Sequence, residues 1–70
     1  MSAARAYDGE VEVGERVTLL DLTTAAVSDV RIGEGELSPE SPLGSALLGR
    51  HVGDVVELPS GRFEIVEIDG

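Results

Sequence analysis

The sequence predicts an α+β fold: a twisted, mainly antiparallel sheet of four or five strands with one short helix packed on it. Two observations support this prediction. Short runs rich in Val and Ile are separated by turn residues, and one proline-started segment has helical spacing. With one Phe, one Tyr and no Trp, the core must be aliphatic.

The first pair of strands is predicted on either side of the turn Thr23-Thr24-Ala25. Val17–Leu22 has apolar residues on both faces of the pleat, and Ala26–Ile32 returns beside it as a hairpin. Period-two alternation in the returning strand directs three side chains inward, those of Ala26, Val30 and Ile32.

A second hairpin joins Asp54–Leu58 to Arg62–Ile68 through Pro59-Ser60-Gly61. In the last strand Phe63 and Ile65 occupy one face of the pleat, whereas Val66 and Ile68 occupy the other. We therefore expect a bulge, a strong twist or burial of both faces near Ile65.

The helix is predicted at about Pro42–Leu48. Ser41 is a good N-cap, Pro42 fits the first helical position, and Gly49 suits the left-handed residue that ends a helix. The apolar side chains that cover the sheet share one face: Leu43, Ala46 and Leu47.

The length of 70 residues allows one domain. Residues 1–10 are polar and turn-like, which indicates a flexible lead-in, and the domain occupies residues 11–70. Without cysteine, packing alone must hold the domain together. No targeting segment is visible, so a cytoplasmic protein is expected.

The net charge is −9, from 14 acidic residues against five arginines. This balance argues against direct DNA binding and against a membrane surface, since both are polyanionic.

No residue set suggests catalysis, and we predict that the chain is not an enzyme. The single histidine, His51, has only Asp54 as a nearby carboxylate, so a structural or surface role is expected. Glu34, Glu36 and Glu40 lack the spacing of a calcium loop and indicate a solvated acidic loop. No catalytic residue, metal site or cofactor is assigned.

The helix-start segment, residues 39–44, is the most unusual surface that the sequence predicts. Pro39 and Pro42 stiffen it, and a rigid, partly apolar surface binds a partner at a lower ordering cost than a flexible one. The alternative is a stiff loop that only starts a helix.

Three blocks of the chain resemble the C-terminal domain of the GreA/GreB transcription factors. They are Arg16–Leu22, Ser41–Asp54 with its Ser-Pro-Leu-Gly start and Val-Gly-Asp turn, and Phe63–Ile68. The resemblance covers about Val11 to Ile68. The related regulator of nucleoside diphosphate kinase has a similar domain.

The resemblance implies an FKBP-like fold and a monomer that docks on bacterial RNA polymerase. The docking place in the family is the rim of the secondary channel, against a coiled coil of the largest subunit. By position, the contact residues are Glu40, Ser41, Pro42 and Leu43, with Glu40 where the family usually has Asp. The implied function is regulation of transcription elongation.

In the family a helical hairpin precedes this domain, and acids at its tip help to hold a metal ion at the polymerase active site. Ala4-Arg5 resembles the end of that hairpin. We therefore expect an excised domain or a hairpin-less relative, with no cleavage-stimulating activity by itself.

Two alternatives stay open. A regulator could bind another protein, such as nucleoside diphosphate kinase, through an exposed sheet. A peptidyl-prolyl isomerase would need an aromatic-walled pocket, for which the chain offers only Tyr7 and Phe63.

Overall fold

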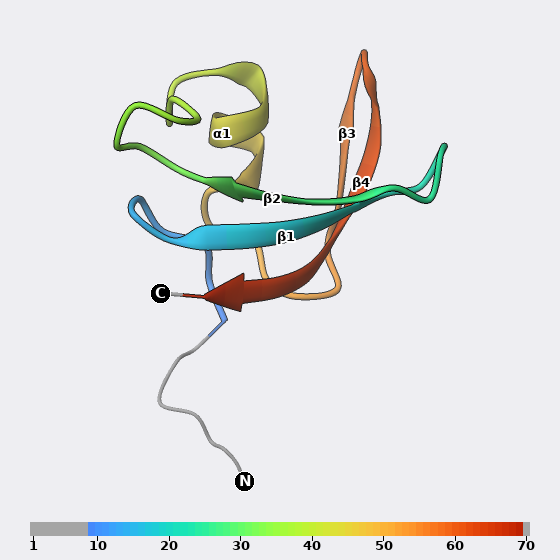
Figure 1. The fold of residues 1–70 in the computed structure, drawn as a ribbon, viewed down its shortest axis with the longest axis horizontal. Coiled ribbons are helices and arrows are strands. Elements are labelled where there is room, and N and C mark those ends of the chain that lie inside the picture. Colours follow the sequence, from blue (N-terminus) through green and yellow to red (C-terminus); the bar gives the residue numbers. More distant parts are fainter. Residues whose placement is uncertain (1–8, 70) are drawn as a thin grey trace, which may run out of the picture.

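The computed structural model describes residues 9–69, and in this range the sheet has four strands. They are β1 (Arg16–Asp21), β2 (Val27–Arg31), β3 (Val55–Leu58) and β4 (Gly61–Asp69). All neighbouring pairs are antiparallel, in the order β2-β1-β4-β3 (Figure 1). The two predicted hairpins are therefore confirmed, and β1 and β4 join them in the centre of the sheet.

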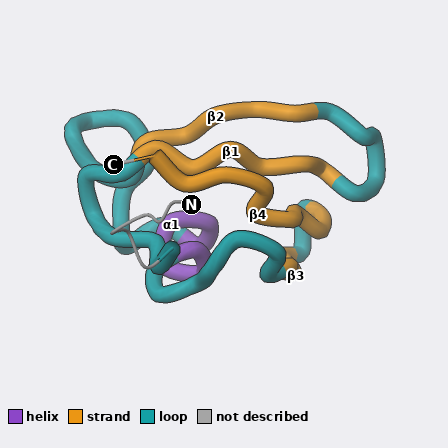
Figure 2. The backbone as a smooth tube through the Cα atoms, turned by 90° about the horizontal axis from the view of Figure 1, so that it is seen from below, coloured by secondary structure: helices purple, strands orange, loops and turns teal. Residues whose placement is uncertain are grey.

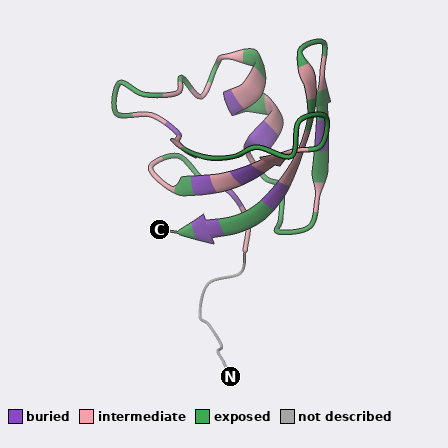
Figure 3. Cartoon of the chain, turned by 45° about the vertical axis from the view of Figure 1, so that its right-hand side comes forward, coloured by how far each residue is buried: buried purple, intermediate pink, exposed green. Residues whose placement is uncertain are grey.

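The expected irregularity near Ile65 is a bulge at Val66. Leu19 of β1 pairs with Ile65 and the preceding Thr18 pairs with Glu67, so Val66 has no counterpart on β1. The extra residue restores the alternation, and both Ile65 and Ile68 are buried. Figure 3 shows the buried positions interrupted by exposed ones along β4.

One prediction about the first hairpin is wrong: Ala26 is exposed. It lies just before β2, where its carbonyl accepts a hydrogen bond of 2.8 Å from the Asp21 amide. Figure 1 shows this end of the hairpin extending away from α1, so an inward direction there meets no core. Ile32 is buried and Val30 is half-buried, as predicted.

The helix α1 (Pro42–Leu47) ends one residue earlier than predicted, with Leu48 as its C-cap. Gly49 follows with a φ of 82°, the left-handed conformation that its position predicted. Leu47 is buried, while Leu43 and Ala46 pack against the core at its edge. Ser45 points to solvent, as the helical spacing requires.

One face of the sheet, the inner face, carries the core, and α1 packs against it (Figure 2). In the described chain the buried apolar side chains are Val11, Val17, Leu19, Ile32, Leu47, Val56, Ile65 and Ile68. Each contributes about 1.5–3 kcal/mol to folding through burial. The opposite face, the outer face, has no helix of residues 9–69 over it.

The chain enters the domain beside the turn that follows α1. The Val11 amide donates to the Arg50 carbonyl at 2.8 Å, and the Gly49 amide donates to the Val11 carbonyl at 3.0 Å. Glu10 forms a bridge with His51, so ordered pairing starts within the predicted lead-in. Residues 9–69 contain no helix with the length and apolar character that crossing a bilayer requires.

Candidate docking surface

The helix-start segment is held by hydrogen bonds centred on Ser41. The Ser41 hydroxyl donates to the Ser38 carbonyl at 2.7 Å and accepts from the Gly44 amide at 3.0 Å. The Ser41 amide also donates to the Ser38 carbonyl, at 3.0 Å. Ser41 is thus the predicted N-cap, and it closes the preceding turn as well.

Two residues fix the shape of this segment: Ser38, which lies just outside the predicted range, and Gly44, which lies within it but was given no contact role. The Ser38 hydroxyl accepts from the Glu40 amide at 3.1 Å. A Cβ at Gly44 would clash with the Ser38 carbonyl oxygen, so the close approach of the turn requires glycine. The signal was present, since a glycine inside a short helix is costly without a packing reason.

The four predicted contact residues divide into two pairs. Glu40 and Pro42 are exposed, and within residues 9–69 the Glu40 carboxylate has neither an ion pair nor a hydrogen bond. Ser41 is half-buried with its hydroxyl already engaged, and Leu43 is half-buried against the core. Glu40 and Pro42 are therefore the side chains that are available to a partner, whereas Ser41 and Leu43 hold them in place.

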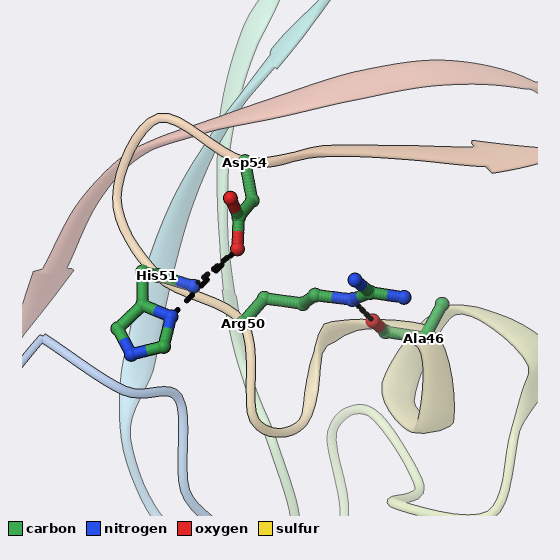
Figure 4. Close-up of polar contacts among 4 residues, drawn as sticks. All are labelled: Ala46, Arg50, His51 and Asp54. Atoms are coloured by element: carbon green, nitrogen blue, oxygen red, sulfur yellow. Dashed lines mark hydrogen bonds and ion pairs between the residues drawn. The ribbon is translucent and has the colours of Figure 1, made fainter.

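Polar contacts of Arg50, His51 and Asp54 hold the turn after α1 (Figure 4). Arg50 donates from Nε to the carbonyl of Ala46 at 3.2 Å, which satisfies a free carbonyl of the last helical turn. The carboxylate of Asp54 accepts from the His51 amide at 2.9 Å and lies 3.8 Å from His51 Nδ1. The His51 side chain is 58% exposed, so it lies at the surface.

The acidic side chains of the predicted loop do not come together at one point. Glu34, Glu36 and Glu40 are all exposed, and in residues 9–69 no three His, Asp or Glu side chains gather as a metal site would require. Phe63 is half-buried against the core. Tyr7 and the Ala4-Arg5 pair lie outside the described residues.

Comparison with known proteins defines the class to which this domain belongs. Residues 6–69 match the family described as "Transcription elongation factor, GreA/GreB, C-term". The chain therefore belongs to this family, and the resemblance found in the sequence is confirmed.

Particular relatives agree with this assignment. The transcription elongation factor GreA of Thermotoga neapolitana is 39% identical over 71 residues, covering 84% of this chain and 46% of that protein. The GreA of Roseiflexus is 37% identical, with 86% and 45% covered. The crystal structure of GreA factor homolog 1 of Thermus thermophilus matches with a TM-score of 0.75 at 32% identity, covering 96% of this chain and 53% of that one. The chain thus spans about half the length of these relatives.

Proposed function

We propose that this domain is an RNA polymerase-binding module of a Gre-type elongation factor, docking at the secondary-channel rim through its helix-start segment. The observation that carries the proposal is that Glu40 and Pro42 are exposed close together at the start of α1. Both are exposed, and both are held on a hydrogen-bonded turn in a chain that belongs to the GreA/GreB family. A preformed turn loses little conformational freedom on binding.

The FKBP-like character of the fold and a cytoplasmic, monomeric state belong to the same proposal.

The negative charge of the domain favours a partner with a basic docking surface. The net charge of −9 favours encounter with a positive protein surface. Glu40 supplies a specific anion at the proposed contact, while Pro42 supplies an exposed apolar ring with a fixed backbone.

The test is binding of the whole chain to purified bacterial RNA polymerase, measured by fluorescence anisotropy. The combined substitution Glu40→Gln and Pro42→Ala should weaken binding by about tenfold or more, because it removes both available side chains and leaves the turn in place. Matched controls are Glu36→Gln and Pro59→Ala, which change an exposed acid and an exposed proline elsewhere. These controls should leave the affinity almost unchanged.

Two results would contradict the proposal at different levels. Equal binding by the double variant and the wild type would show that the helix-start segment is not the docking site, although polymerase would remain the partner. Failure of the wild-type chain to bind polymerase would remove the partner. Ser41→Ala is unsuitable as the sole probe, since it also removes the helix cap and so lowers stability by about 1 kcal/mol.

We further propose that the chain regulates elongation without stimulating transcript cleavage and without catalysis of its own. Support comes from the exposed position of His51 and from the scattered acids of the described chain. Cleavage of the transcript in stalled polymerase complexes, or isomerisation of a prolyl peptide, would overturn this. Binding to purified nucleoside diphosphate kinase but not to polymerase would favour the alternative regulator.

A further inference from the structure

The outer face of the sheet carries an aliphatic row that no element of residues 9–69 covers. Strand pairing brings into register, from edge to edge, Val27, Leu20, Glu64 and Val55. Val27 is 64% exposed and Val55 is 42% exposed, and the bulged Val66 beside the row is 39% exposed. These residues alternate along the strands with the buried Leu19, Ile65 and Val56, so the row faces away from the core, and Figure 2 shows α1 on one side of the sheet.

Acidic side chains accompany these aliphatic residues. Glu64 lies within the row, half-buried between Leu20 and Val55. In the neighbouring row Glu67 pairs with Thr18, whose hydroxyl donates to Asp29 at 2.8 Å. Within residues 9–69 the side-chain carboxylates of Glu64 and Glu67 form neither an ion pair nor a hydrogen bond. A partly buried carboxylate without a cation favours a partner that supplies one.

The shape of the surface favours a helix as the partner. Helices cover the faces of sheets, whereas extended segments pair with their edges. Three interstrand spacings give the row a width of about 14 Å, enough to seat one helix with a diameter of about 10 Å.

A second copy of the chain is the less favoured occupant. Each copy carries a net charge of −9, so two copies repel each other, although Arg16, Arg31 and Arg62 also lie on the outer face. The negative charge also disfavours an anionic lipid surface.

We infer that the outer face is a second interaction surface, which binds a basic amphipathic helix of a protein partner. The apolar stripe of the helix packs on Val27, Leu20, Val55 and Val66, and its Lys or Arg side chains pair with Glu64 and Glu67. This surface is separate from the helix-start segment and does not depend on the polymerase proposal.

The test is a titration of the ¹⁵N-labelled whole chain, followed by NMR, with two synthetic helical peptides. One is a Leu/Lys amphipathic peptide, and the other has the same pattern with Glu in place of Lys. Only the Leu/Lys peptide should bind, and the largest amide shifts should fall on β1, β4 and β3 at Leu20, Glu64, Val66 and Val55.

Charge variants distinguish the effect of acids on the outer face from the effect of the net charge of the chain on peptide binding. Glu64→Lys should weaken binding of the Leu/Lys peptide by about tenfold or more. Glu36→Lys makes the same change in net charge at an exposed position outside the strands and should weaken it by less than about threefold, because solvent and salt screen an exposed charge. Glu67→Lys, at an exposed position, repeats the test without the half-buried site.

Apolar variants probe the aliphatic row in the same way. Val27→Ser should weaken binding, whereas Val13→Ser, at an equally exposed valine outside the outer face, should not. Thermal unfolding of every variant verifies that it is folded.

Several results would overturn the inference. They are equal weakening by Glu64→Lys and Glu36→Lys, equal binding of the Leu/Glu peptide, or shifts centred on the helix-start segment. Shifts that change with protein concentration before peptide is added would mean that a second copy covers the face. Glu40→Gln should leave peptide binding intact, which keeps this test independent of polymerase docking.

Discussion

Ala25 has a φ of 64°, in the left-handed region that residues with a Cβ disfavour. The hairpin turn imposes this conformation. The Asp21 carboxylate accepts from the Thr23 amide at 2.8 Å and from the Thr24 amide at 3.3 Å, and the Ala25 amide donates to the Asp21 carbonyl at 2.7 Å. The side chain of Asp21 thus organises a turn whose last residue is strained.

Replacing Ala25 with Gly should therefore stabilise the domain. Relief of the left-handed conformation outweighs the added freedom of the unfolded chain, and we expect a gain of up to about 1 kcal/mol in the free energy of unfolding. Urea denaturation measures the change. The neighbouring substitution Ala26→Gly is the control, since Ala26 has no positive φ, and it should cost about 0.5–1 kcal/mol. If both variants lose stability, the turn is not strained at residue 25.

Among the elements, α1 depends most on its surroundings. It is six residues long, too short to be stable alone, and it is held by its cap and by Leu47 in the core. The turn at Ser38 packs directly on the first helical turn at Gly44. Any side chain at Gly44 must displace that turn and, with it, Glu40.

Gly44→Ala should accordingly destabilise the domain, although alanine is the better helix former. The added Cβ would meet backbone atoms that cannot rotate away, and overpacking of this kind costs about 1–3 kcal/mol. Urea denaturation again measures the loss, and polymerase affinity should fall with it. Ser45→Ala, one residue further on an exposed position of α1, should be neutral or slightly stabilising. Wild-type stability in Gly44→Ala would show that the 38–41 turn moves freely.

Sequence reasoning succeeded where the determinants are local. The cap at Ser41, the proline at the first helical position and the left-handed Gly49 are each set by neighbours within a few residues. It was wrong for Ala26, because alternation gives the direction of a side chain but not whether anything lies there to cover it.

The same limit applied to the candidate site. The sequence placed Glu40, Ser41, Pro42 and Leu43 together, but only the folded backbone separates the two exposed side chains from the two that support them. The outer-face row was equally invisible, since it requires the register of four strands.

At the scale of the whole molecule, charge repulsion is the dominant electrostatic feature. The chain has a net charge of −9, and the arginine–carboxylate ion pair between Arg62 and Glu57, at 3.4 Å, is exposed at both ends. Such a pair contributes about 0–1 kcal/mol, so attraction does not balance the repulsion among the acids.

Added salt should therefore raise the stability of the domain. An increase in ionic strength from about 0.01 M to about 0.15 M shortens the screening length from about 30 Å to about 8 Å and weakens repulsion between acids across the molecule. The midpoint of urea denaturation at pH 7 should rise when NaCl is added. A fall in the midpoint would mean that attractive pairs outweigh repulsion. Polymerase binding should show the opposite trend and weaken with salt.

The bulge at Val66 has a consequence for the history of this family. Because Ile65 and Ile68 both remain in the core with one residue too many between them, β4 can lose Val66 and still pair Ile65 with Leu19 and Glu67 with Thr18. A residue can therefore be inserted or deleted at this position without exchanging the buried and exposed faces of the rest of the strand. Alignments of relatives that differ in length by one should place their gap at Val66 and not in the neighbouring turn.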